Sequence, residues 1–395
     1  NPTELVFGKG QIARLPKLIP ADKRIMVTFG GGSVKRNGVY DQVVRALEGR
    51  DFIEFWGIEA NPSVETLRKA IALGKERKVD FLLAVGGGSV IDGTKLIAAG
   101  LLYDGDAWEI VLRGRAEKSV PLATVLTISA TGSEMNSGAV ISRYETKEKY
   151  PFSGDYPLFS ILDPGVLYSL PKRQIACGLA DTFVHVLEQY LTAPGQSRLM
   201  DRWAEGILHT VSEIAPEALS DNPDYDVMSE YMLSATLALN DMIRMGVRED
   251  WATHMIGHEI TALHGLTHGA TLAIVINGTL RVLREQKRGK LLQYGERIWG
   301  IAGGTETVRL RPTRRFSVRW GFRRGFRRRA SARRPLPRSN GASTPGAGNT
   351  ARRGMSMASW PGGFSKPASD GAISHKKIPA VDEAVGIFVC GTDYS

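Results

Sequence analysis

Two runs of glycine, each between an apolar segment and a helical one, constrain the fold of this chain more than any other feature. The run Gly30–Ser33 follows the β-branched segment Arg24–Phe29, and the run Gly86–Ser89 follows the apolar segment Phe81–Val85. The second apolar segment does not alternate with polar residues, as is typical of a strand buried on both faces of a parallel sheet. A strand, a glycine run and a helix, occurring twice, predict an α/β layer built on a parallel sheet.

The chain continues this pattern up to residue 172 and then changes. The further strands that we expect are Phe52–Gly57, Leu122–Ile128 and Leu158–Leu162, and the expected helices are Gly38–Leu47, Ser63–Lys75 and Val90–Ala99. After Pro171 helical periodicity dominates. The helices expected there are Gln174–Leu191, Arg198–Leu219, Asp226–Met242 and Trp251–His264. The pattern therefore predicts an α/β domain over residues 1–172 and an all-α domain over residues 173–303.

The positive charge of the chain is concentrated in its last part. The chain contains 51 Lys+Arg and 41 Asp+Glu, a net charge of +10. Residues 304–395 hold 18 of the basic and 5 of the acidic residues, which leaves 33 and 36 in residues 1–303, a net charge of −3. A mildly acidic body gives no electrostatic reason to expect nucleic acid as a partner.

The segment 304–395 has the composition of an atypical tail. Its arginine-rich part, Arg309–Arg338, shows neither helical nor strand periodicity, and Gly, Ser, Pro and Ala dominate the residues that follow it. Three interpretations are open. The segment is the product of a frameshift in a GC-rich gene, a disordered tail, or a nucleic-acid-binding arm in which aromatic side chains interleave with arginines.

Cysteine content and hydropathy indicate the setting of the protein. The chain has two cysteines, Cys177 and Cys390. Two cysteines do not make a disulfide framework, so we expect a cytoplasmic protein. No stretch approaches the roughly 20 apolar residues of a membrane helix, so we expect no membrane association.

The glycine run Gly86–Ser89 joins a buried strand to a helix start, where backbone N–H groups and the helix dipole favour a phosphate group. Neither run fits the G-x-G-x-x-G fingerprint of dinucleotide-binding folds, and many glycine-rich turns only turn the chain tightly. Two such runs, with Asp92 three residues after Ser89, leave a dinucleotide site and simple tight turns as alternatives of similar weight.

Four of the seven histidines fall within fifteen residues, namely His254, His258, His264 and His268. Upstream, Asp181 and His185 are four residues apart in a segment that we expect to be helical, so both lie on one face. The same spacing separates the first two histidines of the cluster and the last two. One carboxylate with several imidazoles suits a divalent metal such as Fe(II) or Zn(II). For any single histidine a structural hydrogen-bonding role is the alternative, and the spacing does not say which of the four would bind.

Taken together, these segments resemble the iron-containing (group III) alcohol dehydrogenase family, and within it the NADPH-dependent aldehyde reductases and butanol dehydrogenases. The resemblance extends from about Phe7 to about Trp299. The runs that carry it are GGGSVK at Gly30–Lys35, GGGSVIDGTK at Gly86–Lys95, ATGSEMNSGAVIS at Ala130–Ser142, DTFVHVLEQY at Asp181–Tyr190 and WATHMIGHEITALHGLTHG at Trp251–Gly269.

The resemblance implies a dehydroquinate synthase-like fold, with an α/β dinucleotide-binding domain followed by an all-α metal-binding domain. The metal ligands that it implies are Asp181, His185, His254 and His268. His258 would then lie near the nicotinamide as a catalytic proton relay, and His264 has no implied role. Family members continue past Trp299 with further helices, so the all-α domain is expected to be incomplete in this chain.

The resemblance also implies which residues contact the cofactor. The implied positions are Gly31, Gly32 and Ser33 at the adenosine ribose, Gly87, Gly88 and Ser89 at the pyrophosphate, Asp92 toward the nicotinamide, and Thr127, Asn136 and Lys149. Relatives that prefer NAD often carry Asp at the position of Gly32, where a carboxylate accepts from the ribose 2′-OH and repels a 2′-phosphate. With Gly32, Ser33 as a donor and Lys35 as a charge, the resemblance implies NADP(H).

The implied activity is metal-dependent transfer of hydride between NADP(H) and aldehydes or primary alcohols, by a homodimer. Two alternatives concern the C-terminus: a catalytically impaired homologue with a disrupted all-α domain, or an enzyme body that carries a basic nucleic-acid-binding tail. A third alternative is a dehydroquinate synthase-like lyase, which shares the fold and the metal.

Overall fold

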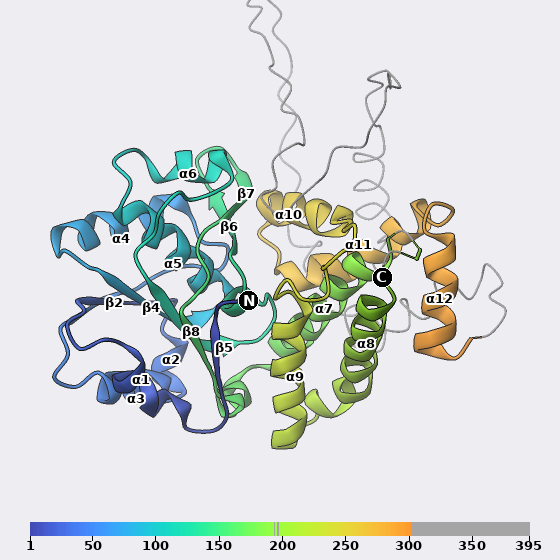
Figure 1. Cartoon of the computed structure of the whole chain (residues 1–395), viewed down its shortest axis with the longest axis horizontal. Coiled ribbons are helices and arrows are strands. Elements are labelled where there is room, and N and C mark those ends of the chain that lie inside the picture. Colours follow the sequence, from blue (N-terminus) through green and yellow to red (C-terminus); the bar gives the residue numbers. More distant parts are fainter. Residues whose placement is uncertain (193, 196, 302–395) are drawn as a thin grey trace, which may run out of the picture.

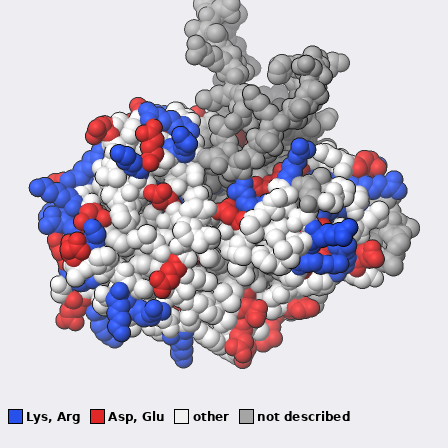
Figure 2. Space-filling model, in the orientation of Figure 1, with Lys and Arg blue, Asp and Glu red and all other residues white. Residues whose placement is uncertain are grey.

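The computed structural model describes residues 1–192, 194–195 and 197–301, and places a sheet-containing half beside a helical half (Figure 1). The atypical segment 304–395 lies outside the described residues, so its three interpretations stay predictions. Figure 2 shows acidic and basic side chains interspersed over the visible surface of the described residues. None of the helices in the described part of the chain is long and apolar enough to cross a membrane.

A parallel six-stranded sheet forms the first half of the molecule, with the strand order β1-β8-β5-β4-β2-β3. The strands are β1 (Glu4–Phe7), β2 (Ile25–Phe29), β3 (Phe52–Phe55), β4 (Phe81–Gly87), β5 (Leu122–Ile128) and β8 (Phe159–Leu162). Every residue of β2 is buried, and so is β4 up to Gly86, as the apolar runs predict. The predicted fold class is therefore confirmed for this half.

The two glycine runs lie side by side at the carboxyl ends of the neighbouring strands β2 and β4. Strands β2 and β4 pair in parallel, with Phe29 opposite Val85, so the chain leaves both strands at the same level. From β2 the chain goes to β3 on one side, and the later strands add on the other side, beginning with β4. Such a reversal of strand order opens a crevice at the carboxyl ends of the strands, where α/β proteins bind ligands.

Helices cover both faces of the sheet (Figure 1). They are α1 (Leu15–Leu18), α2 (Ser33–Arg36) and α3 (Val39–Ala46) on one side, and α4 (Val64–Glu76), α5 (Gly88–Leu101) and α6 (Ala107–Arg113) on the other. Short 3₁₀ turns lie at η1 (Gln11–Arg14), η2 (Ser133–Met135) and η3 (Pro164–Ser169). An antiparallel hairpin of β6 (Gly138–Arg143) and β7 (Glu148–Ser153) was not among the predicted elements.

The second half consists of helices packed around α7. The helices are α7 (Lys172–Tyr190), α8 (Arg198–Ala218), α9 (Tyr225–Ala238), α10 (Ala252–His264), α11 (His268–Val282) and α12 (Arg288–Trp299). Every residue from Ile175 to Tyr190 is buried, as expected for a helix enclosed by others. Helices α8, α9 and α11 pack directly on α7. The all-helical character of this half agrees with the prediction, although α11 and α12 were not predicted.

Two predicted boundaries are wrong. The run Gly86–Ser89 forms no separate loop, because β4 continues to Gly87 and α5 begins at Gly88. Gly88 allows close packing at this junction, since an added Cβ on Gly88 would lie 2.2 Å from Thr131 Oγ1. Helix α9 ends at Ala238 and not at Met242, and the left-handed φ of 71° at Asp241 turns the chain away.

Candidate metal centre and cofactor crevice

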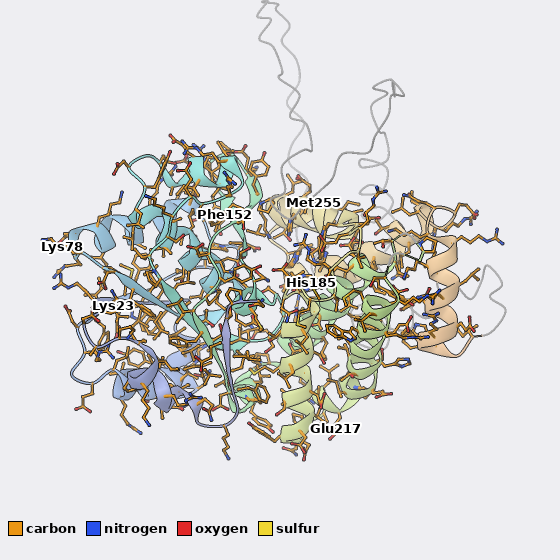
Figure 3. All side chains as sticks on the ribbon, in the orientation of Figure 1. Lys23, Lys78, Phe152, His185, Glu217 and Met255 are labelled. Atoms are coloured by element: carbon orange, nitrogen blue, oxygen red, sulfur yellow. The ribbon has the colours of Figure 1, made fainter. Side chains whose placement is uncertain are left out.

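Three histidine rings gather around one carboxylate oxygen in the interior of the helical half. Asp181 and His185 lie one turn apart on α7 and are both almost fully buried. His254 comes from the first turn of α10, and His268 is the first residue of α11. Figure 3 labels His185 in the middle of the molecule, whereas Met255, which follows His254, lies at the surface.

The distances define a compact cluster. The Nε2 atoms of His185, His254 and His268 lie 3.5, 3.7 and 3.8 Å from Asp181 Oδ1. The rings of His185 and His254 stack with their centroids 4.6 Å apart, and the rings of His254 and His268 are 5.3 Å apart. Of the four side chains that the resemblance singled out, Asp181, His185 and His254 have ligand atoms that all lie within 4.8 Å of one another, and His268 joins them through its contact with Asp181.

The polar atoms at the centre of this cluster are left without partners. Asp181 Oδ1 and His254 Nε2 are buried, and neither has a hydrogen-bond partner among the described residues. Leaving a buried polar atom unpaired costs about 1–3 kcal/mol. Three imidazole nitrogens and one carboxylate oxygen are a donor set that Fe(II) and Zn(II) accept. The cluster therefore fits a divalent metal, whose charge would satisfy these atoms.

The protonation of His185 and His268 suits this role, whereas His254 must lose a proton to bind a metal at neutral pH. Burial lowers the pKa of His185 to about 4 and holds the pKa of His268 well below its ordinary value. Both rings are therefore neutral at neutral pH, as a ligand must be. Burial also opposes charge on His254, but the carboxylates of Asp181 and Glu188 outweigh it and raise the pKa of His254 to about 9.

Glu188 is a functional candidate that the sequence analysis missed. Its carboxylate accepts from the Nδ1–H of His254 at 2.5 Å, on the side of the ring opposite Asp181. Glu188 lies seven residues after Asp181 and three after His185, so helical periodicity places it on the same face of α7. That spacing was the signal that could have identified it.

The two remaining histidines of the cluster have different surroundings. His258 is buried, with its ring centroid 5.0 Å from that of His268 and 6.4 Å from that of His254. His264 is exposed at the end of α10. The predicted end of this helix at His264 is confirmed. Gly265 takes a left-handed φ of 65° and ends the helix, so the four-residue spacing of His264 and His268 does not place them on one helical face.

The glycine positions predicted to contact a cofactor lie at the carboxyl ends of β2 and β4. Gly31 and Ser33 are exposed and Gly32 is half-buried at the end of β2, while Gly87 and Ser89 are half-buried and Gly88 buried at the end of β4. Gly32 has a left-handed φ of 89° and no atom within 4 Å of an added Cβ, so its side is open.

Several other predicted cofactor residues already have partners within the protein. Asp92 accepts from Ser133 Oγ at 2.6 Å and from the N–H of Val140 at 2.9 Å. Asn136 donates to the carbonyls of Gly132 and Leu239 at 2.9 and 2.8 Å. The contacts of Asp92 hold α5, η2 and the hairpin together.

Lys149 and Thr127 complete the predicted cofactor set. Thr127 is buried near the end of β5. Lys149 lies on β7 and donates to Asn61 Oδ1 at 2.9 Å. Burial lowers the pKa of Lys149 to about 8, although Asp92 and Asp181 act against this shift. Burial lowers the pKa of His258 and of His268, and the positive charge of Lys149 adds to this lowering.

Comparisons with known proteins agree with this architecture. The family model described as "Iron-containing alcohol dehydrogenase" matches residues 2–164, and the model "Fe-containing alcohol dehydrogenase family, C-terminal" matches residues 175–313. The chain is 52% identical over 316 residues to the NADPH-dependent aldehyde reductase YqhD of Escherichia coli K12, covering 78% of this chain and 82% of that protein. It is 44% identical over 329 residues to the probable NADH-dependent butanol dehydrogenase 1 of Bacillus subtilis 168, covering 81% and 85%. A crystal structure of E. coli K-12 YqhD superposes with a TM-score of 0.80 at 51% identity, covering 81% of this chain and 85% of the other.

Proposed function

Because the chain belongs to the iron-containing alcohol dehydrogenase family, we propose that it is an NADP(H)-dependent aldehyde reductase or alcohol dehydrogenase whose metal is Fe(II) or Zn(II). Metal-dependent oxidoreduction of alcohols or aldehydes with a nicotinamide cofactor follows from the family itself. One observation supports the site proposal above all others: three imidazole nitrogens converge on the unpaired Oδ1 of Asp181.

We assign the residues the following parts. Asp181, His185, His254 and His268 would hold the metal. When bound, the metal and the nicotinamide supply Lewis-acid polarisation of the carbonyl group and the hydride. His258 is buried and next to His268, and a ring nitrogen of His258 relays a proton toward the substrate oxygen.

The preference for NADP(H) over NAD(H) is supported by the crevice at the end of β2. The open space beside Gly32 accommodates a 2′-phosphate, which an aspartate at that position would repel. Lys35 follows on α2, and its ammonium group lies 4.2 Å from the Trp56 ring and 5.0 Å from the Tyr40 ring. Aromatic faces attract a cation and hold it close to the glycine run. Of the two relatives above, YqhD is named for NADPH and the other for NADH.

Other parts of the proposal depend on residue chemistry or on the family. We propose Gly31, Gly32, Ser33, Gly87, Gly88, Ser89, Asp92, Thr127, Asn136 and Lys149 as the cofactor-contacting set. We also propose a homodimer, which light scattering of the purified protein tests, and a cytoplasmic location, which the small number of cysteines favours.

The activity is tested with the purified protein, a simple aldehyde such as butanal, and either NADPH or NADH. We expect oxidation of NADPH that stops after metal removal by a chelator and returns on addition of Fe(II) or Zn(II). No oxidation with butanal, in a preparation that binds the metal, would favour an impaired homologue or the lyase alternative.

The ligand set is tested with two histidine variants from the same segment. His268→Ala should abolish metal binding and activity together. His264→Ala is the matched control, because it removes an exposed imidazole four residues away and should change neither. Full activity of metal-stripped His268→Ala would contradict the assignment.

A further inference from the structure

One buried carboxylate on α7 holds the start of α10 as well as a ring of the cluster. Glu188 is 5% exposed and accepts three N–H groups from two consecutive residues. Its Oε1 accepts from the backbone N–H of Thr253 at 2.5 Å, and its Oε2 accepts from the backbone N–H of His254 at 3.0 Å and from the ring Nδ1 at 2.5 Å.

Two carboxylates, one from the segment before it and one from α7, accept from the first N–H groups of helix α10. The residue before it, Trp251, contributes no side-chain hydrogen bond to the first turn. The first N–H groups of a helix have no partner within the helix, and a negative charge next to them is favourable. Asp250 Oδ1 accepts from the N–H of Ala252 at 3.1 Å, and Glu188, from a helix 66 residues away in sequence, supplies the acceptors for the next two N–H groups.

The same carboxylate determines which nitrogen of His254 carries the proton. With the Nδ1–H donated to Glu188, the lone pair of neutral His254 is on Nε2, which points toward Asp181 Oδ1 at 3.7 Å. The other tautomer would leave the lone pair on Nδ1, facing a carboxylate, and would direct an N–H into the cluster. A carboxylate partner also makes the imidazole a better donor to a metal.

We propose that Glu188 is a positioning residue that orients His254, selects its metal-binding tautomer and thereby sets the affinity of the centre for its metal. This inference rests on the proposed metal site. If Glu188 only capped α10, its loss would lower thermal stability and leave the metal affinity of the folded protein unchanged. Metal affinity therefore separates the two roles.

The variant Glu188→Gln removes the charge and one acceptor while it keeps the size of the side chain. The control is Glu205→Gln on α8. Glu205 is also 5% exposed, and it accepts from Tyr190 Oη at 2.9 Å and from Arg297 at 2.8 Å. It is therefore matched in burial and in loss of hydrogen bonds, but its partners lie outside the histidine cluster.

The experiment titrates the metal-stripped full-length protein with Co(II) in competition with a chromophoric chelator, and records the visible Co(II) spectrum. We expect Glu188→Gln to bind Co(II) roughly 10- to 100-fold more weakly with an altered spectrum, and Glu205→Gln to match the parent protein in both. If Glu188→Gln does not fold, Glu188→Asp, which withdraws the carboxylate by one methylene, should show the same direction of change.

The outcomes distinguish the inference from the proposal beneath it. Parent-like affinity and spectrum in a folded Glu188 variant overturn the positioning role while the metal site stands. An equal loss of affinity in Glu205→Gln also overturns it, because the effect would then follow from general destabilisation. Failure of the parent protein to bind Co(II) overturns the proposed metal site and this inference with it.

Discussion

Replacing Gly269 tests whether the close contact between α11 and α7 places His268 in the histidine cluster. Gly269 directly follows His268 on α11, where that helix crosses α7. An added Cβ on Gly269 would lie 2.2 Å from the carbonyl oxygen of Cys177 and 2.8 Å from its carbonyl carbon. Cys177 is on α7, one turn before Asp181. We therefore predict that Gly269→Ala forces α11 away from α7 and moves His268 from Asp181.

The size of this movement follows from the distances. To bring the new Cβ to an ordinary contact of at least 3.4 Å, α11 must shift by about 1 Å. The obstacle is backbone, which has no rotamer to change. Metal–ligand distances tolerate only about 0.2 Å, so a ligand displaced by this amount is lost or strained. Overpacking of this kind costs about 1–3 kcal/mol of folding free energy.

The assay is metal content and metal affinity of the purified protein, together with its thermal unfolding. We expect Gly269→Ala to bind the metal at least about tenfold more weakly and to unfold at a lower temperature. Gly206→Ala is the control, because Gly206 lies in the exposed face of α8 with nothing within 4 Å of an added Cβ. It should stabilise the protein by about 0.5–1 kcal/mol. Parent-like metal affinity and Tm in Gly269→Ala would refute the close helix contact.

Three further predictions address charge, cofactor and metal. Burial lowers the pKa of Lys95 from 10.5 to about 8, so between these pH values the unfolded chain binds more protons and the stability of the parent rises with pH. Lys95→Met lacks this rise. In denaturant unfolding, the difference in free energy of unfolding between the parent and Lys95→Met should therefore grow by at most about 3 kcal/mol between pH 8 and pH 10.5. A difference that stays constant with pH would argue against a lowered pKa of Lys95. Gly32→Asp should lower kcat/KM for NADPH roughly tenfold relative to NADH, and an unchanged ratio would disprove the proposed 2′-phosphate site. Metal at about 100 times its Kd should raise the free energy of unfolding of the parent by about 2.7 kcal/mol and leave His268→Ala unaffected; stabilisation of both would place the metal elsewhere.

Patterns within short segments predicted most of the fold. The apolar run Phe81–Val85 and the glycines after it predicted β4 and the helix that follows, because burial on both faces leaves a continuous apolar run. The helical periods of α7 and α8 predicted their extents within two residues. The hairpin β6–β7 was missed, because Lys149 and the exposed Tyr150 interrupt its apolar pattern.

The sequence by itself determined the fold class, the glycine runs and the residue types available to a metal. It did not determine which histidines meet. His264 and His268 have helical spacing, yet Gly265 separates them into two helices, and only His268 reaches Asp181. Nor did it reveal that Glu188 holds His254 across 66 residues of chain. The physical reason is that periodicity reports which face of one element is buried, whereas the packing of α7, α10 and α11 against one another decides which side chains share that interior.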